Sequence, residues 1–165
     1  MRDDATIERA IHEHGDVIWR VCLMRMGQRA DAQDAFQETF LKYATHDDVA
    51  FDSAEHERAW LIRVATNHCL DVLRSAGYAT TSMDEEIERT PSIEPRTQGD
   101  EAIDPELWDV TRALDQLPGN QRQAIYLTVC EGYPATDVSH MMGVPTNTVY
   151  SWVARAKKKL KEVLG

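Results

Sequence analysis

Apolar positions recur at helical spacing along most of the chain, and no stretch shows the strict alternation typical of a half-buried β-strand. In the first part of the sequence, three apolar stripes predict helices over residues 6–25, 30–45 and 53–77. Gly27 is placed to end the first helix, and Ser53 is placed to cap the third. This pattern predicts a bundle of three helices.

The last part of the sequence predicts a second group of helices. A helix that begins near Asp104 ends at Pro118, and further helices are expected over residues 120–131, 135–142 and 146–164. The short helix, the turn at Gly143 and the long helix that starts at Thr146 together indicate a helix-turn-helix.

Between these groups the composition changes. Residues 77–107 carry 2 basic and 9 acidic side chains and few apolar ones, which is typical of a flexible linker. The predicted fold class is therefore all-α, with two small helical domains joined by an acidic flexible linker. The predicted boundaries are 1–77 for the first domain, 78–104 for the linker and 105–165 for the second domain.

The net charge of −10 argues at first against nucleic-acid binding, but the charges are unevenly distributed. Residues 147–161 contain five basic side chains and no acidic one, a pattern that fits either a DNA footprint or a solvated helix face. The second helix of a helix-turn-helix enters the major groove with its N-terminus first. Its early polar residues would then meet base edges, and its later basic residues would meet phosphates. The first set is Thr146, Asn147, Thr148, Tyr150 and Ser151, and the second includes Arg155, Lys158 and Lys159.

Other chemistries find little support in the sequence. No apolar run approaches the roughly 20 residues of a membrane helix. The six histidines lack metal-ligand spacing, and the three cysteines are interpreted as small buried apolar residues. No glycine-rich phosphate loop and no nucleophile elbow are present. We therefore expect a cytoplasmic protein that is not an enzyme and has no cofactor, metal, membrane or small-molecule substrate.

Three blocks of sequence resemble a known family. Residues 31–42, which read Asp-Ala-Gln-Asp-Ala-Phe-Gln-Glu-Thr-Phe-Leu-Lys, resemble the second-region signature of the extracytoplasmic-function (ECF) sigma factors of the sigma-70 family. Residues 58–74 look like the continuation of that region. Residues 114–118, 131–133 and 144–159 are similar to the fourth region. The blocks occur in the family's order and span about two-thirds of the chain.

The resemblance implies a promoter-specificity subunit of RNA polymerase that has no catalysis of its own. Its partners would be promoter DNA and core RNA polymerase, docked on the coiled coil of the largest subunit, with an anti-sigma protein as a candidate further partner. Contact with polymerase is assigned to Asp34, Gln37, Glu38, Phe40 and Leu41. Contact with the minus-ten element is assigned to Phe51, Arg63, Asn67, Asp71 and Arg74, together with the loop over residues 46–57. In the fourth region, Arg122 joins the helix residues named above as a contact to the minus-thirty-five element.

Two departures from the family pattern stand out. Arg74 is followed by Ser75, Ala76 and Gly77 where the family usually continues with basic residues, so weak duplex affinity is expected for the first domain. Trp152 occupies a position that is normally smaller or basic, and the sequence offers no account of it.

One alternative function remains open at this point. A one-component helix-turn-helix regulator would use the same C-terminal helix without touching polymerase. The block at residues 31–42 distinguishes the sigma-factor hypothesis from the regulator hypothesis, because a simple regulator does not need a polymerase-binding segment.

Overall fold

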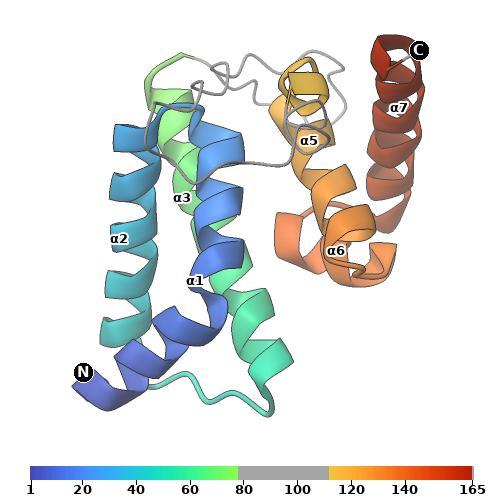
Figure 1. Ribbon diagram of the computed structural model, residues 1–165. Helices are drawn as coiled ribbons and strands as arrows, with labels where there is room; N and C mark the ends of the chain where they lie inside the picture. The colour runs from blue at the N-terminus through green and yellow to red at the C-terminus, as the bar shows by residue number, and fades with distance from the viewer. Residues whose placement is uncertain (78–111, 165) are drawn as a thin grey trace.

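The computed structural model describes residues 1–77 and 112–164, which form two groups of helices side by side (Figure 1). The predicted linker and the start of the second domain lie outside the described residues. Over the described ranges the chain contains helices and turns and no strand, in agreement with the predicted all-α class.

The first group contains α1 (Asp4–Met26), α2 (Arg29–Thr45) and α3 (Ala54–Ser75). The predicted signals operate at two of its helix ends. Gly27, at φ 79°, adopts a positive φ and ends α1, which glycine can do without steric strain. The Ser53 side chain accepts a hydrogen bond from the backbone N–H of His56 at 3.1 Å and so caps α3 as predicted.

The core of this first group forms where the three apolar stripes meet. The fully buried residues include Ile18 and Val21 of α1, Tyr43 of α2, and Leu61 and Ile62 of α3. Two of the three cysteines, Cys22 and Cys69, are also buried, as the sequence predicted. The third, Cys130, is exposed, so the prediction of a buried residue is wrong there.

The second group contains α5 (Gly119–Ile125), the π-helical turn η1 (Tyr126–Cys130), α6 (Ala135–Met142) and α7 (Thr146–Leu164). Gly143, in the left-handed conformation at φ 69°, makes the turn between α6 and α7. Trp152 faces inward from α7 and is only 5% exposed, because it packs in the hydrophobic core. The sequence did not explain a tryptophan at this position, and the structure shows that it is a core residue.

The two groups pack against each other through contacts of α1 with α5 and of α3 with α6. Buried apolar residues of both groups belong to one continuous cluster, which includes Leu61 of α3 and Val138 of α6. Polar side chains bridge the same interface. Gln123 of α5 bonds to Arg25 of α1 and to Thr66 of α3, while Arg122 donates to the backbone carbonyl of Met24. The described residues therefore form a closed arrangement of the two groups.

Candidate nucleic-acid and protein interfaces

The outer face of α2 carries an acidic and apolar stripe. Asp34, Gln37 and Leu41 are exposed and Glu38 is half-buried, and their spacing of three and four residues places them along one side of the helix. Leu41 is 55% exposed, so the stripe includes an apolar side chain that is open to a partner. A surface of this kind suits a basic partner that also offers an apolar pocket.

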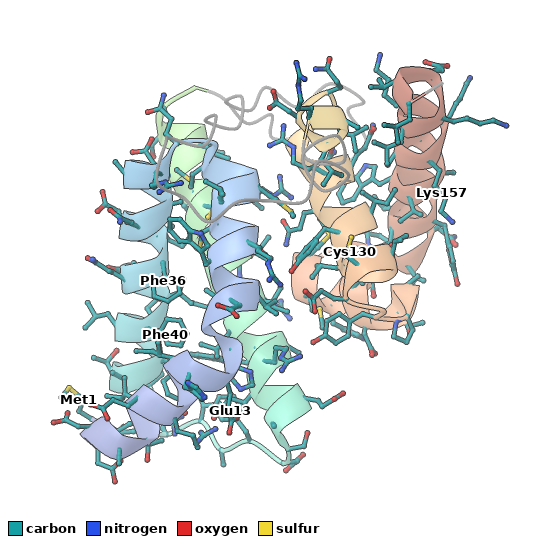
Figure 2. All side chains as sticks on the ribbon, in the orientation of Figure 1. Met1, Glu13, Phe36, Phe40, Cys130 and Lys157 are labelled. Atoms are coloured by element: carbon teal, nitrogen blue, oxygen red, sulfur yellow. The ribbon has the colours of Figure 1, made fainter. Side chains whose placement is uncertain are left out.

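Phe40 does not belong to this outer stripe. Its ring is 5% exposed and packs against Phe36 at a centroid distance of 4.9 Å (Figure 2). Phe36 in turn meets Trp19 of α1 edge-on at 6.3 Å. Phe36 thus helps to hold α2 on α1, and Phe40 is part of the buried core behind it. The predicted polymerase contact of Phe40 stays untested, and in this conformation the ring is not accessible to a partner.

The loop between α2 and α3, residues 46–53, is anchored by an aromatic cluster. Phe51 lies half-buried against Trp60 at 5.5 Å, His56 at 5.4 Å and Tyr43 at 6.2 Å between ring centroids. Its ring is therefore engaged with protein on several sides. The exposed side chains of the loop include those of Asp47, Asp48, Ala50 and Asp52.

Arg2 holds the same loop from the N-terminal segment. Its Nε donates to the carbonyl of Tyr43 at 2.9 Å, and its Nη2 donates to the carbonyls of His46 at 3.0 Å and Val49 at 2.6 Å. The guanidinium also lies over the rings of Tyr43 and Phe51, at 4.6 and 5.3 Å. Sequence reasoning missed this residue, because a lone arginine near a chain start carries no periodic signal.

One face of α3 presents the four helix residues assigned to the minus-ten element. Arg63, Asn67, Asp71 and Arg74 are all exposed and recur every three or four residues along the helix. Arg74 lies 3.7 Å from Asp71, which offsets part of its charge. Since α6 packs on α3 without covering these residues, the stripe stays open in the closed arrangement.

Beneath these surfaces lies a buried polar network centred on Glu57. Its carboxylate accepts hydrogen bonds from Arg9 at 3.0 Å, from the hydroxyl of Tyr43 at 2.8 Å and from His14 at 2.9 Å. Arg58 donates to the Nδ1 atom of His14 at 3.2 Å, so the His14 proton lies on Nε2 and points to Glu57. Burial acts to raise the pKa of the Glu57 carboxyl, but the three donors together lower it below its ordinary value.

Glu13, His14 and Glu57 place potential metal ligands within 4.8 Å of one another. Figure 2 labels Glu13 at this cluster. Arg9, however, donates to both carboxylates, and Arg58 occupies Nδ1 of His14. These hydrogen bonds engage atoms that a metal would use, and the arginine cations beside them oppose a further positive charge. The cluster therefore fits a structural polar network better than a metal site.

The outer face of α7 carries the predicted base-reading and phosphate-binding residues. Asn147, Tyr150, Arg155, Lys158 and Lys159 are exposed, whereas Val149 and Ala156 face the core. Thr146, Thr148 and Ser151 are half-buried, and the Thr146 hydroxyl donates to Ser139 of α6 at 3.3 Å. Figure 2 shows Lys157 on the outer side of the same helix. The structure thus brings eight of the nine predicted residues onto one helix, at the edge of the molecule (Figure 1).

The ninth residue, Arg122, lies elsewhere. Its side chain is 1% exposed and donates to the carbonyls of Leu114 and Leu117 at 3.0 Å, as well as to that of Met24. The guanidinium ties the second group together and joins it to α1. Its predicted DNA contact stays untested, and in this conformation the side chain is out of reach of DNA.

In the described part of the chain, none of the helices combines the length and the apolar character needed to cross a membrane.

The comparisons with known proteins point to one family. Residues 10–78 match the family model described as Sigma-70 region 2, and residues 107–160 match the one described as Sigma-70, region 4. The ECF RNA polymerase sigma factor SigL of Mycobacterium tuberculosis is 32% identical over 98% of this chain and 90% of its own length. SigM of the same organism, also an ECF sigma factor, is 31% identical over 99% of this chain and 79% of its own length.

Among solved structures, the sigma factor RpoE of Bartonella quintana, crystallised with the anti-sigma factor NepR, has the same fold. The TM-score is 0.72, at 24% identity and 95% coverage of each chain. CnrH, solved with the cytosolic domain of CnrY, gives a TM-score of 0.64 at 21% identity, over 98% of this chain and 89% of its own. A one-component regulator is not favoured, because both sigma regions match in order along the sequence. The chain belongs to the extracytoplasmic-function subfamily of the sigma-70 family of RNA polymerase sigma factors.

Proposed function

We propose that this ECF sigma factor divides its work among three separate surfaces. The outer face of α2 binds core RNA polymerase, α3 with the loop before it binds the minus-ten element, and the outer face of α7 reads the minus-thirty-five element. The observation that carries the proposal is that three different helices each present exposed residues with the chemistry that the proposed partner requires.

The α2 surface suits a positively charged protein helix. Asp34 and Glu38 supply negative charge, which steers a basic partner into place. Leu41 supplies an exposed apolar side chain, and its burial against the partner would favour binding. The partner is the coiled coil of the largest polymerase subunit.

The surface of α3 and the 46–53 loop suits an opened DNA strand. Arg63 and Arg74 can bind phosphates, and Asn67 can make a paired hydrogen bond to a base edge. Two arginines, one of them paired with Asp71, give little attraction for intact duplex. The first domain therefore holds a strand that has been separated, with support from polymerase.

The α7 surface suits intact duplex. Asn147 and Thr148 lie at the N-terminal end of the helix, where a major-groove helix meets bases, and the basic residues follow toward its C-terminal end. Arg155, Lys158 and Lys159 are then placed for phosphates. This arrangement makes the second domain the principal duplex reader.

The closed arrangement cannot serve both promoter elements at once. The minus-ten and minus-thirty-five elements lie about 25 base pairs apart, or roughly 85 Å at 3.4 Å per base pair. The two helical groups contact each other through α1, α3, α5 and α6. We propose that residues 1–77 and 105–165 are separate domains joined by residues 78–104 as a linker. The two domains come apart when the factor binds polymerase and promoter.

In this proposal the chain acts by binding alone, in the cytoplasm, and polymerase performs the chemistry. The related folds of RpoE and CnrH were solved with NepR and with a domain of CnrY, and the first of these partners is named an anti-sigma factor. An anti-sigma protein is accordingly a proposed third partner, one that would keep the α2 surface from polymerase.

The α2 assignment is tested by binding to core polymerase that carries no other sigma factor. Asp34→Arg and Leu41→Ala should each weaken binding by at least about tenfold, since each removes a central contact of the proposed surface. The matched control is Glu8→Arg, which makes the same charge change at an exposed position of α1. Equal binding by the wild type, Asp34→Arg and Glu8→Arg would place the polymerase contact elsewhere.

A further inference from the structure

The Arg2 side chain bonds both to the C-terminal end of α2 and to the loop that follows it. Its guanidinium donates to the carbonyls of Tyr43 in the last turn of α2, His46 at the end of that helix, and Val49 within the following loop. The last carbonyls of a helix have no partners inside the helix, and a cation there also meets the negative end of the helix dipole. The Arg2 side chain therefore helps to close the end of α2 and to fix where the loop begins, and the N-terminal amine of Met1, which bonds to Asp47 at 2.6 Å, adds a second contact there.

The Arg2 side chain also packs on the aromatic residues beneath the loop. Arg2 lies over the rings of both Tyr43 and Phe51, which are stacked on each other at an interplanar angle of 18°. The backbone N–H of Arg2 also donates to the carbonyl of Ala44 at 2.8 Å, so the segment runs along the end of α2. These contacts hold Phe51 against the protein and leave the loop's polar side facing outward.

The far end of the loop is held by independent contacts. Ser53 caps α3, and the backbone N–H of Asp52 donates to Nδ1 of His56 at 3.2 Å. The contacts made by Arg2 are thus needed mainly at the first half of the loop, between His46 and Val49. A further turn contact there, from the Val49 N–H to the His46 carbonyl, is long at 3.3 Å.

We propose that Arg2 is a positioning residue for base recognition at the minus-ten element. It fixes the 46–53 loop in the shape that accepts the non-template strand, so that ordering the loop costs little when the strand binds. The inference rests on the proposed role of this loop and adds a residue outside the region 2 match, which begins at residue 10. Arg2 itself need not touch DNA.

Base preference, rather than overall activity, is the informative measurement. Holoenzyme is assembled from core polymerase and the full chain tagged at its C-terminus, and is given a promoter identified by transcript-start mapping of this factor. The minus-ten positions are randomised in one library and the minus-thirty-five positions in a second, and transcripts are sequenced. Wild-type holoenzyme should prefer the best over the worst base by about tenfold or more at one minus-ten position.

Arg2→Ala should reduce that preference to about threefold or less and leave the minus-thirty-five preference and core binding unchanged. Arg2→Lys should resemble Arg2→Ala, because one ammonium cannot reproduce the planar fork that reaches three carbonyls and two rings. The control is Glu8→Ala, an exposed α1 position away from the loop, which should behave as wild type. A loss of stability alone would lower the amount of active holoenzyme and leave base ratios intact.

The outcomes separate this inference from the proposed function. If Arg2→Ala holoenzyme keeps the base preference of the wild type at the minus-ten positions, the proposed role of Arg2 is wrong. The proposed function then still stands. If Arg2→Lys keeps the full minus-ten base preference, the positioning role does not depend on the planar guanidinium group. No minus-ten preference in the wild type would overturn the proposed role of the loop and, with it, this inference.

Discussion

The side-chain amide of Gln123 in α5 donates a hydrogen bond to the hydroxyl of Thr66 in α3 at 2.7 Å, and both residues are fully buried. The carbonyl oxygen of the same amide accepts from Nε of Arg25 in α1 at 2.6 Å. One glutamine thus connects three helices across the boundary between the two sigma regions. Since buried polar groups are costly without partners, these bonds favour the closed arrangement over looser packings.

Replacing this glutamine should loosen the closed arrangement. Gln123→Ala removes both bonds and leaves a cavity, which should weaken the interface by about 1–3 kcal/mol. Small-angle X-ray scattering on the free protein should then show a larger radius of gyration. Gln116→Ala, at an exposed position before α5, is the matched control and should leave the radius unchanged. An identical radius for Gln123→Ala and wild type would show that this residue does not hold the two groups together.

Trp152 provides a test of how α7 contributes to the hydrophobic core. Because its side chain is buried, Trp152→Ala should lower the free energy of unfolding by about 3–5 kcal/mol, measured by denaturant titration. Tyr150→Ala removes an aromatic ring two positions away that is 61% exposed, and should change stability by less than about 0.5 kcal/mol. Similar effects from the two changes would contradict the inward orientation of Trp152.

Glu57 predicts a specific pH dependence of stability. Burial acts to raise the pKa of its carboxyl, but the hydrogen bonds from Arg9, Tyr43 and His14 outweigh burial and lower that pKa in the folded state. A lowered pKa means that the carboxylate stabilises the fold at pH values above the unfolded pKa of about 4.3. This contribution is lost as pH falls through the folded pKa.

The comparison of wild type with Glu57→Gln tests this sign. At pH 7 the variant should be less stable by about 1–3 kcal/mol, because it loses charged hydrogen bonds. The difference should shrink as pH is lowered from about 5 toward 3, measured by thermal unfolding at each pH. A difference that is constant over this range would mean that ionisation of Glu57 does not contribute to folding.

The α7 surface predicts two kinds of DNA-binding defect. Substituting Asn147 and Thr148 should change which minus-thirty-five sequences are preferred, since these residues are assigned to base edges. Lys158→Ala should weaken binding to all sequences alike and reduce the slope of log affinity against log salt by about 0.9. Promoter binding by holoenzyme, measured on a panel of upstream sequences at several salt concentrations, separates the two. Uniform losses from both changes would contradict this division of labour.

Features that follow from local chemistry were predictable from the sequence. Three predicted features depend only on neighbours a few residues away: the helix cap at Ser53, the turn at Gly143 and the period of the apolar stripes. The structure confirms all three. The exposed stripe on α2 was also predictable, because it follows from helix periodicity once the inward face is known.

Features that depend on residues far apart in the sequence were not predictable. Arg2 contacts carbonyls more than 40 positions away, and Gln123 bonds to Arg25 across 98 positions, so no local pattern could pair them. Arg122 has a charge typical of a DNA contact, yet nearby carbonyls and the closed packing place it in the interior. Cys130 was predicted to be buried, and the π-helical turn that carries it leaves it exposed.

Transcription in a fully defined system tests whether this chain directs core polymerase to promoters through two sequence elements. The purified chain is added to core polymerase that lacks any other sigma factor, with sheared genomic DNA of the source organism as template, and transcript starts are sequenced. We expect a limited set of transcript starts that share two upstream sequence elements and that disappear with Asp34→Arg. Failure of the wild-type chain to associate with core polymerase, or starts no different from those of core polymerase alone, would contradict this expectation.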